Sequence, residues 1–189
     1  LISFACADGQ KKHIISPEFK QAGNNIYHFY HQNKENGLPD YETLKEVFDF
    51  VHQQIKAGNI VSVKTIKDGG AAVSLAKMCF GNHLGAEVEI AESQVLEKNI
   101  GGFIIESKTE LAHSQLHKIG KVTEGKTLVI NKKAFDLGKL LSAYTQTFEN
   151  LFPTAEPDRI EINIDEKLNS TSPKNIIIKK HNIAKPRVF

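Results

Sequence analysis

The sequence has little cysteine, almost no net charge and no long apolar segment, and each shortage excludes a class of protein. Its two cysteines, Cys6 and Cys79, lie far apart and form no closely spaced pair. A disulfide-stapled scaffold or a structural zinc site needs more cysteines than this, and closer together. The pattern therefore predicts two reduced thiols in a cytoplasmic protein.

The charges are balanced, because 24 Lys and Arg residues face 22 Asp and Glu residues and leave a formal net charge of +2. This balance is unlike that of a nucleic-acid polycation, so no nucleic-acid partner is expected. No apolar run approaches the ~20 residues of a membrane helix, so no membrane partner is expected either. With 40% hydrophobic residues in 189, the chain can bury roughly 70% of its unfolded surface without staples.

The two ends of the chain suggest a piece of a longer polypeptide. It opens without Met inside an apolar run, residues 1–5, and closes on residues 185–189, which resemble the start of another strand. From residue 153 onward the apolar pattern loosens around Pro157 and residues 169–173. We therefore expect one domain over residues 1–152 and a linker over 153–189.

Apolar periodicity predicts helices that alternate with strands. A stripe with spacings of three and four predicts a helix that begins after Asp40 and ends at Gly58 and Asn59. Other helices are expected over residues 71–80, 109–114 and 133–151. Strands are expected over residues 1–7, 11–15, 25–31, 60–66, 86–90, 101–106, 117–122 and 127–130. This alternation is typical of a layered α/β domain with a mixed sheet.

The most informative junction lies at residues 63–72, where a strand leads into an Asp-Gly-Gly turn and a helix of small residues. The first amides of a helix are unpaired and its N-terminal end is partially positive, so a phosphate can bind there. Lys64 and Lys67 offer positive charge, and Asp68 could hold a metal or cap the helix. The alternative is a tight strand-to-helix turn with surface lysines nearby, because the segment matches neither common phosphate-binding fingerprint.

Other polar pairs give weaker indications of chemistry. His113 and His117 could share a helix face, but no glutamate of a zinc-protease motif lies between them. Glu87 and Glu89 share one face of a strand, where two solvated carboxylates are expected in preference to an acid/base pair. His28 lies three positions before His31 on the expected strand, and the two would point to opposite faces.

The segment over residues 67–82 resembles the Asp-Gly-Gly helix signature of carboxy-terminal domains in the aminoimidazole ribonucleotide synthetase superfamily. Within it, the chain is most similar to the phosphoribosylformylglycinamidine synthases. Residues 1–5, 16–18, 25–27 and 140–151 agree in order with the second such domain of these enzymes, and residues 185–189 resemble the first strand of their glutaminase domain. The resemblance covers essentially the whole chain.

The resemblance implies a three-layer α/β/α domain, partly ferredoxin-like, which pairs with a nucleotide-binding partner domain. In the full enzymes it implies ATP or ADP, Mg²⁺, formylglycinamide ribonucleotide and ammonia from glutamine, in a ligase reaction of purine biosynthesis. It assigns no catalytic residue to this chain. The positions expected to bind nucleotide or phosphate are Lys64, Thr65, Lys67, Asp68, Gly69 and Gly70, and Asp68 is also a candidate metal ligand.

The chain departs from the family pattern just before Asp-Gly-Gly. Thr65 replaces an acidic residue that holds magnesium in relatives, and Lys67 replaces a hydroxyl-bearing residue. Lys64 and Lys67 could neutralise phosphate charge in place of a metal. Two alternatives stay open. One is a non-catalytic scaffold or interface domain of the same enzyme, and the other is another ATP-dependent member of the superfamily, such as a selenophosphate or thiamine-phosphate enzyme.

Overall fold

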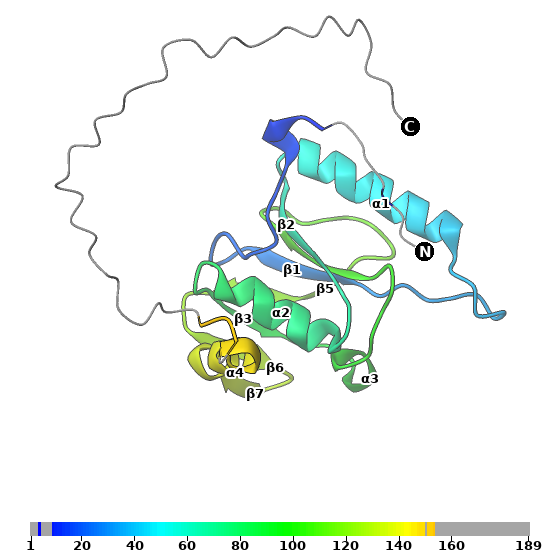
Figure 1. Ribbon diagram of the computed structural model, residues 1–189. Helices are drawn as coiled ribbons and strands as arrows, with labels where there is room; N and C mark the ends of the chain where they lie inside the picture. The colour runs from blue at the N-terminus through cyan, green and yellow to red at the C-terminus, as the bar shows by residue number, and fades with distance from the viewer. Residues whose placement is uncertain (1–3, 5–8, 150, 154–189) are drawn as a thin grey trace, which may run out of the picture. The chain divides into compact units, whose positions relative to one another are not determined.

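The computed structural model describes residue 4, residues 9–149 and residues 151–153. In these residues seven strands form one mixed sheet in the order β2-β4-β1-β5-β3-β6-β7 (Figure 1). The strands are β1 (Asn25–Phe29), β2 (Ile60–Thr65), β3 (Gly85–Val88), β4 (Phe103–Ser107), β5 (His117–Thr123), β6 (Thr127–Ile130) and β7 (Lys133–Asp136). The α-helices are α1 (Tyr41–Lys56), α2 (Gly70–Phe80), α3 (Glu92–Val95) and α4 (Leu137–Glu149), and one 3-10 turn, η1, spans Lys11–His13.

The sheet contains a split βαβ unit of the kind found in ferredoxin-like folds. Strands β1 and β2 both pair antiparallel with β4, which lies between them, and α1 connects them. The two strands therefore run in the same direction and end at the same edge of the sheet. On the other side of β1, strands β5 and β3 continue the antiparallel pattern, and β3 and β6 form a parallel pair.

Helices cover both faces of the sheet and make two cores. Val47 and Val51 of α1 pack with Tyr27, Phe29 and neighbouring residues on one face. On the other face, α2 packs against alternate residues of the same strands, and α4 adds the buried Leu137. Figure 1 shows α1 on one side of the sheet and α2 on the other. The predicted three-layer α/β/α domain with a mixed sheet is confirmed.

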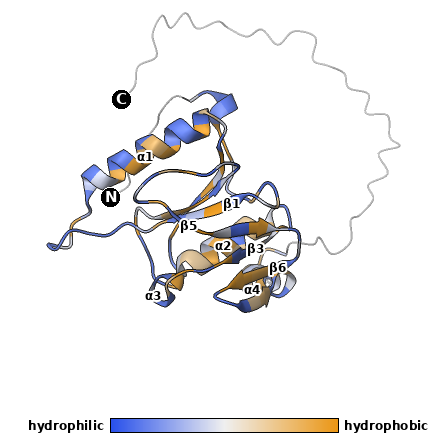
Figure 2. Ribbon diagram, turned by 180° about the vertical axis from the view of Figure 1, so that it is seen from behind, coloured by the Kyte–Doolittle hydropathy of each residue, from blue (hydrophilic) through white to orange (hydrophobic). Residues whose placement is uncertain are grey.

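The two long helices differ because they bury different fractions of their surface. Helix α1 is amphipathic, with Val47 and Val51 buried, and ends where Gly58 adopts φ +78°. Most of α2 is inaccessible, and its small residues let it lie close to the sheet. Figure 2 shows this contrast, since hydrophilic and hydrophobic colours alternate along α1 while α2 is coloured mainly hydrophobic.

The predicted helix over residues 133–151 is wrong in its first turn. Residues Lys133–Asp136 form β7, which pairs antiparallel with β6, and the helix begins only at Leu137. The hairpin needs two residues with positive φ between its strands, and Asn131 and Lys132 adopt φ +50° and +67°. This is the backbone of a type I′ turn, whose twist matches that of the paired strands.

Two further predicted elements are also wrong. Residues 109–114 form a loop instead of a helix, because their amides bond to side chains: Leu111 donates to the Tyr27 hydroxyl and Thr109 to Ser107 Oγ. Residues Lys11–His13 form a 3-10 turn instead of part of a strand. The sequence did not indicate α3. The predicted strand over residues 1–7, apart from Phe4, and the linker after Pro153 lie outside the described residues.

Among the helices of the described residues, none is long and apolar enough to cross a membrane.

Candidate phosphate site at the Asp-Gly-Gly turn

The Asp-Gly-Gly turn joins β2 to α2, as the sequence predicts. Gly69 and Gly70 adopt φ +88° and +68°, a left-handed backbone that glycine accepts without steric cost. Gly69 occupies the N-cap position of α2, and no side chain caps that end of the helix. The first amides of α2 therefore donate no hydrogen bond to a capping side chain.

Packing, as well as backbone conformation, requires a glycine at position 70. A Cβ atom on Gly70 would lie 2.5 Å from the Leu96 carbonyl carbon and 2.6 Å from Val95 O. The residue therefore lets the end of α3 approach the start of α2. Its amide is also occupied, because it donates to Lys67 O at 3.0 Å. The Gly70 amide is thus less suited than the Gly69 amide to donate a hydrogen bond to a phosphate.

Lys64 and Thr65 of the predicted site lie on opposite faces of the sheet. Successive strand residues point to opposite faces, and Lys64 pairs in register with Ile104 while Thr65 pairs with Phe103. Ile104 belongs to the core beneath α2 and Phe103 to the core beneath α1. Lys64 therefore lies on the α2 side, half-buried, whereas Thr65 is exposed on the α1 side.

Asp68 has a partner that the sequence did not indicate. Its Oδ1 lies 2.9 Å from Lys98 Nζ, on the loop between α3 and β4, and the Asp68 side chain is 87% exposed. An ion pair at this exposure contributes little to stability. Its relevance is positional, because Lys98 adds a third lysine near the turn besides Lys64 and Lys67. No motif could have revealed it, since Lys98 is 30 positions away in the sequence.

The donor set does not fit a magnesium site built by the protein alone. Within the described residues, no group of three or more His, Cys, Asp or Glu side chains could hold a metal ion. Asp68 is already paired with a lysine, and Thr65 is on the far face of the sheet. Magnesium prefers several oxygen ligands in octahedral geometry, so Asp68 could contribute one ligand at most.

The other polar candidates are separated by the fold. His113 lies in a loop, 3.5 Å from Glu46 Oε1 and against the ring of Phe50, whereas His117 begins β5. They do not share a helix face. Glu87 is exposed on β3, opposite Lys121.

Burial raises the pKa of the Cys79 thiol to about 12, which removes it as a nucleophile at neutral pH.

Comparison with known proteins decides the family. Residues 20–145 match the family described as AIR synthase related protein, C-terminal domain. The chain belongs to this family. The matched residues include β1, α1, the Asp-Gly-Gly turn and all of α2, so the turn is part of the family's own domain and not of an insertion.

Curated relatives of the chain include subunits of one enzyme. Phosphoribosylformylglycinamidine synthase subunit PurL of Sulfurimonas denitrificans is 28% identical over 172 residues, which is 76% of this chain and 23% of the relative. The PurL subunit of Zymomonas mobilis is 30% identical over 118 residues, 56% of this chain and 16% of the relative. The predicted resemblance is confirmed. The chain spans less than a quarter of the length of these relatives.

Solved structures agree on the fold. Phosphoribosylformylglycinamidine synthase II of Thermotoga maritima has a TM-score of 0.56 at 12% identity, over 69% of this chain and 28% of that one. T. maritima PurL complexed with ATP has a TM-score of 0.56 at 11% identity, over 69% of this chain and 27% of that one. The AIR synthase related C-terminal domain described here therefore has the architecture of a PurL domain.

Proposed function

We propose that this domain supplies a phosphate-binding element to the nucleotide site of a phosphoribosylformylglycinamidine synthase. The observation that carries the proposal is the uncapped start of α2 behind the left-handed Gly69–Gly70 turn. A helix of this length directs unpaired amides and a partial positive charge at a bound anion. T. maritima PurL structures that contain ATP or ADP are consistent with a nucleotide ligand.

The lysines provide the positive charge that, in relatives, a metal held by the missing acidic residue would supply. Lys67 lies in the turn and is exposed, and Lys98 lies within ion-pair distance of Asp68. A phosphate at the start of α2 would compete with Asp68 for Lys98. Lys64 lies on the α2 side of the sheet, while Thr65 faces the other side and the amide of Gly70 already donates to Lys67 O. We therefore drop Thr65 and Gly70 from the phosphate-binding set and keep Lys64, Lys67, Asp68 and Gly69.

The full enzyme would convert formylglycinamide ribonucleotide to formylglycinamidine ribonucleotide. ATP would phosphorylate the formyl amide oxygen, and ammonia released from glutamine would displace the phosphate to form the amidine. This ligase step needs positive charge around the transferring phosphoryl group and a site that excludes water. We assign no catalytic residue to this chain, and expect a glutaminase domain, a nucleotide-binding partner domain and any magnesium ligands besides Asp68 elsewhere in a cytoplasmic enzyme.

Thermal unfolding with and without ligand tests the phosphate site. Pyrophosphate or Mg·ADP at 100 times its dissociation constant should stabilise the domain by ~2.7 kcal/mol, a shift of roughly 2–4 °C per kcal/mol. Lys67→Ala should reduce the shift at a fixed ligand concentration. The matched control is Lys45→Ala, an exposed lysine on α1. A shift that is equal in both variants, or absent in the unmodified chain, contradicts the proposal.

A second candidate function, a scaffold or interface domain, is favoured by an apolar groove beside the same turn. The groove has a volume of about 430 Å³ and lies between α2, α3, α4 and the β6–β7 hairpin, where it is lined by Val73, Leu96, Phe135 and nine other residues. Leu96 and Phe135 are exposed. Under this candidate, Leu96→Asp would weaken assembly with the rest of a full-length enzyme while ligands would leave the melting temperature unchanged.

A further inference from the structure

A second, polar cavity lies at the end of β1, at the edge of the sheet where β2 also ends. Its volume is about 260 Å³. Three separate segments contribute to it: the end of β1 and the residues that follow, the first turn of α1, and the loop before β5. The lining residues are Phe29, Tyr30, Gln32, Asn33, Lys34, Asp40, Thr43 and Gln115.

Asp40 lines this cavity and has one carboxylate oxygen without a hydrogen bond. It occupies the N-cap position of α1, as the sequence predicts, yet its side chain makes no capping hydrogen bond. Instead Oδ2 accepts a hydrogen bond of 2.6 Å from Thr43 Oγ1. Oδ1 is buried and accepts no hydrogen bond within the described part of the chain, although Lys34 Nζ lies 3.5 Å away.

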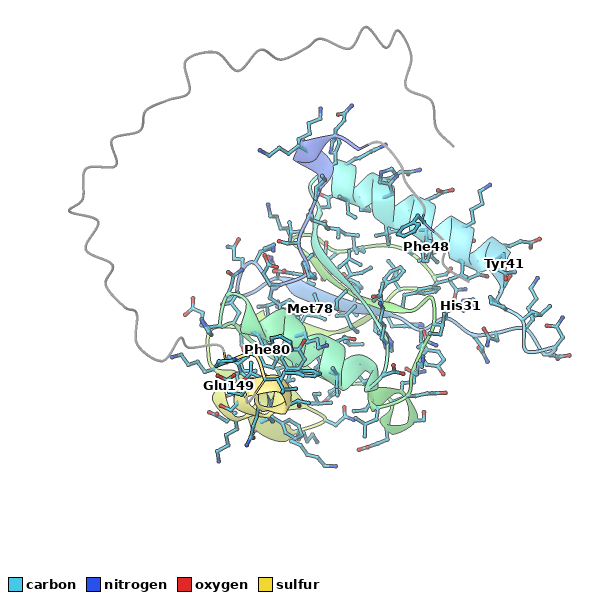
Figure 3. The ribbon with its side chains drawn as sticks, in the orientation of Figure 1. His31, Tyr41, Phe48, Met78, Phe80 and Glu149 are labelled. Atoms are coloured by element: carbon cyan, nitrogen blue, oxygen red, sulfur yellow. The ribbon has the colours of Figure 1, made fainter. Side chains whose placement is uncertain are left out.

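Between the lining residues Tyr30 and Gln32, His31 has two polar ring atoms without hydrogen-bond partners in the described part of the chain. His31 is 3% exposed, and neither ring nitrogen has a hydrogen-bond partner among the described residues. Figure 3 shows it beyond the end of β1, on the side where α1 begins at Tyr41. Burial lowers the pKa of His31 more than the charge of Asp40 raises it, so the ring is neutral at pH 7 and offers one donor and one acceptor. Burying both nitrogens without partners costs free energy.

The cavity is connected to the Asp-Gly-Gly turn by one loop. Between α3 and β4, Glu97 accepts a hydrogen bond from the Tyr30 hydroxyl, Lys98 pairs with Asp68, and Asn99 bonds to the backbone of His31 in both directions. Strands β1 and β2 end at the same edge and are separated only by β4, so the two sites are two strand spacings, roughly 10 Å, apart.

We propose that this cavity binds the vicinal hydroxyls of a ribose, in a ribonucleotide whose phosphates lie at the Asp-Gly-Gly turn. A hydroxyl both donates and accepts, which suits a site that mixes the acceptor Asp40 with the donors Lys34 and Gln115. An ammonium group could only donate and a phosphate could only accept. This inference rests on the proposed phosphate site and deepens it by naming what the ligand carries beyond its phosphates.

Titration calorimetry of the 189-residue chain with three ligands tests it: ADP, 2′,3′-dideoxy-ADP and pyrophosphate. We expect ADP to bind at least 10-fold more tightly than its dideoxy analogue. Asp40→Asn keeps the shape of the side chain, and should lower ADP affinity to that of the analogue while pyrophosphate affinity stays unchanged. The control is Asp49→Asn, which removes the same charge from an exposed position on α1 and should change none of the three affinities.

The outcomes separate the two proposals. If pyrophosphate binds and depends on Lys67, but ADP and its analogue bind equally, the ribose inference is overturned and the phosphate site stands. If pyrophosphate does not bind, while adenosine still binds more tightly than 2′,3′-dideoxyadenosine and loses this preference in Asp40→Asn, the ribose site stands alone. An equal loss of ADP and pyrophosphate affinity in Asp40→Asn overturns the ribose inference, because that result indicates a general structural effect.

Discussion

At the scale of single residues, a buried carboxylate organises the segment before β1. Glu106 is 0% exposed and is the last residue but one of β4. It accepts hydrogen bonds from the backbone amides of Lys20 and Gln21, at 2.8 and 3.0 Å, and from Asn24 Nδ2 at 2.7 Å. Three donors therefore replace the water that this carboxylate loses on folding.

Glu106→Gln should lower the free energy of unfolding by about 1–3 kcal/mol, because one oxygen becomes an NH₂ group that faces backbone donors and leaves one of them unpaired. Urea unfolding followed by far-UV circular dichroism measures the change. Glu87→Gln is the control, since Glu87 is exposed on β3. Equal stability of the two variants would show that the three hydrogen bonds are replaceable by solvent.

A buried histidine should make stability depend on pH. His28 is 3% exposed in β1, and burial together with the positive charge of His117 lowers its pKa to about 4. Its unfolded pKa is near 6.5, so the unfolded chain binds a proton that the folded chain rejects. Its contribution is therefore present above pH 6.5 and is lost as pH falls from 6.5 toward 4.

The size of this effect is up to about 3 kcal/mol, at 1.36 kcal/mol for each unit of pKa difference. Urea unfolding at a series of pH values between 7 and 4 measures it. His28→Gln should flatten the loss in this range, whereas His52→Gln, at an exposed position on α1, should leave it unchanged. The same slope in both variants would assign the pH dependence to other groups.

At the scale of elements, the contact between α2 and α3 depends on the absence of a side chain at Gly70. Gly70→Ala places a Cβ atom against the Leu96 backbone, which cannot rotate away as a side chain can. Gly37→Ala is the matched control, because Gly37 has φ +79° but open space around its Cβ position. Both variants incur left-handed strain of roughly 1–2 kcal/mol, and only Gly70→Ala adds the clash.

We therefore expect Gly70→Ala to destabilise the domain by at least about 2 kcal/mol more than Gly37→Ala, as measured by urea unfolding of both variants. If the two losses are the same, the α2–α3 contact can separate without cost, and Gly70 is required only for its backbone conformation.

The elements that the sequence predicts well are those with a strong local signal. Helix α1 has an apolar stripe and ends two residues before Gly58. The predicted bounds of β6 and the predicted start of α2 agree with the structure to within one residue. The β6–β7 hairpin was missed because its turn uses Asn131 and Lys132 with positive φ, and no glycine marks it. The loop over residues 109–114 was missed because its amides bond to Tyr27 and Ser107, and such distant or irregular partners leave no periodic pattern.

The candidate site was predictable only in part, for the same reason. The strand, turn and helix around Asp68 follow from local sequence, and the structure confirms them. Lys98 and the contact of Gly70 with Leu96 come from a segment about 30 positions away, so no spacing rule could include them. The faces of Lys64 and Thr65 follow from strand alternation, but the sequence does not tell which face carries α2.

At the scale of the whole domain, burial is distributed unevenly across the sheet. Every residue of β1 and β4 is buried, whereas every residue of β7 is exposed. In α4 only Leu137 is buried, and the later aromatic residues Tyr144 and Phe148 are 54% and 61% exposed. The ring of Tyr144 packs against the ring of Phe80, and the ammonium group of Lys77 lies over it, 4.6 Å from its centre.

Local stability should follow this gradient, because segments with few buried contacts open without global unfolding. Hydrogen exchange measured by NMR should show the slowest amides in β1 and β4, with exchange free energies equal to the global value from urea unfolding. Amides in the second half of α4 should exchange through local opening, several kcal/mol below that value. Tyr144→Ala should speed exchange in α4 while leaving β1 and β4 unchanged. Uniform protection across β1, β4 and α4 would instead show that α4 unfolds only together with the sheet.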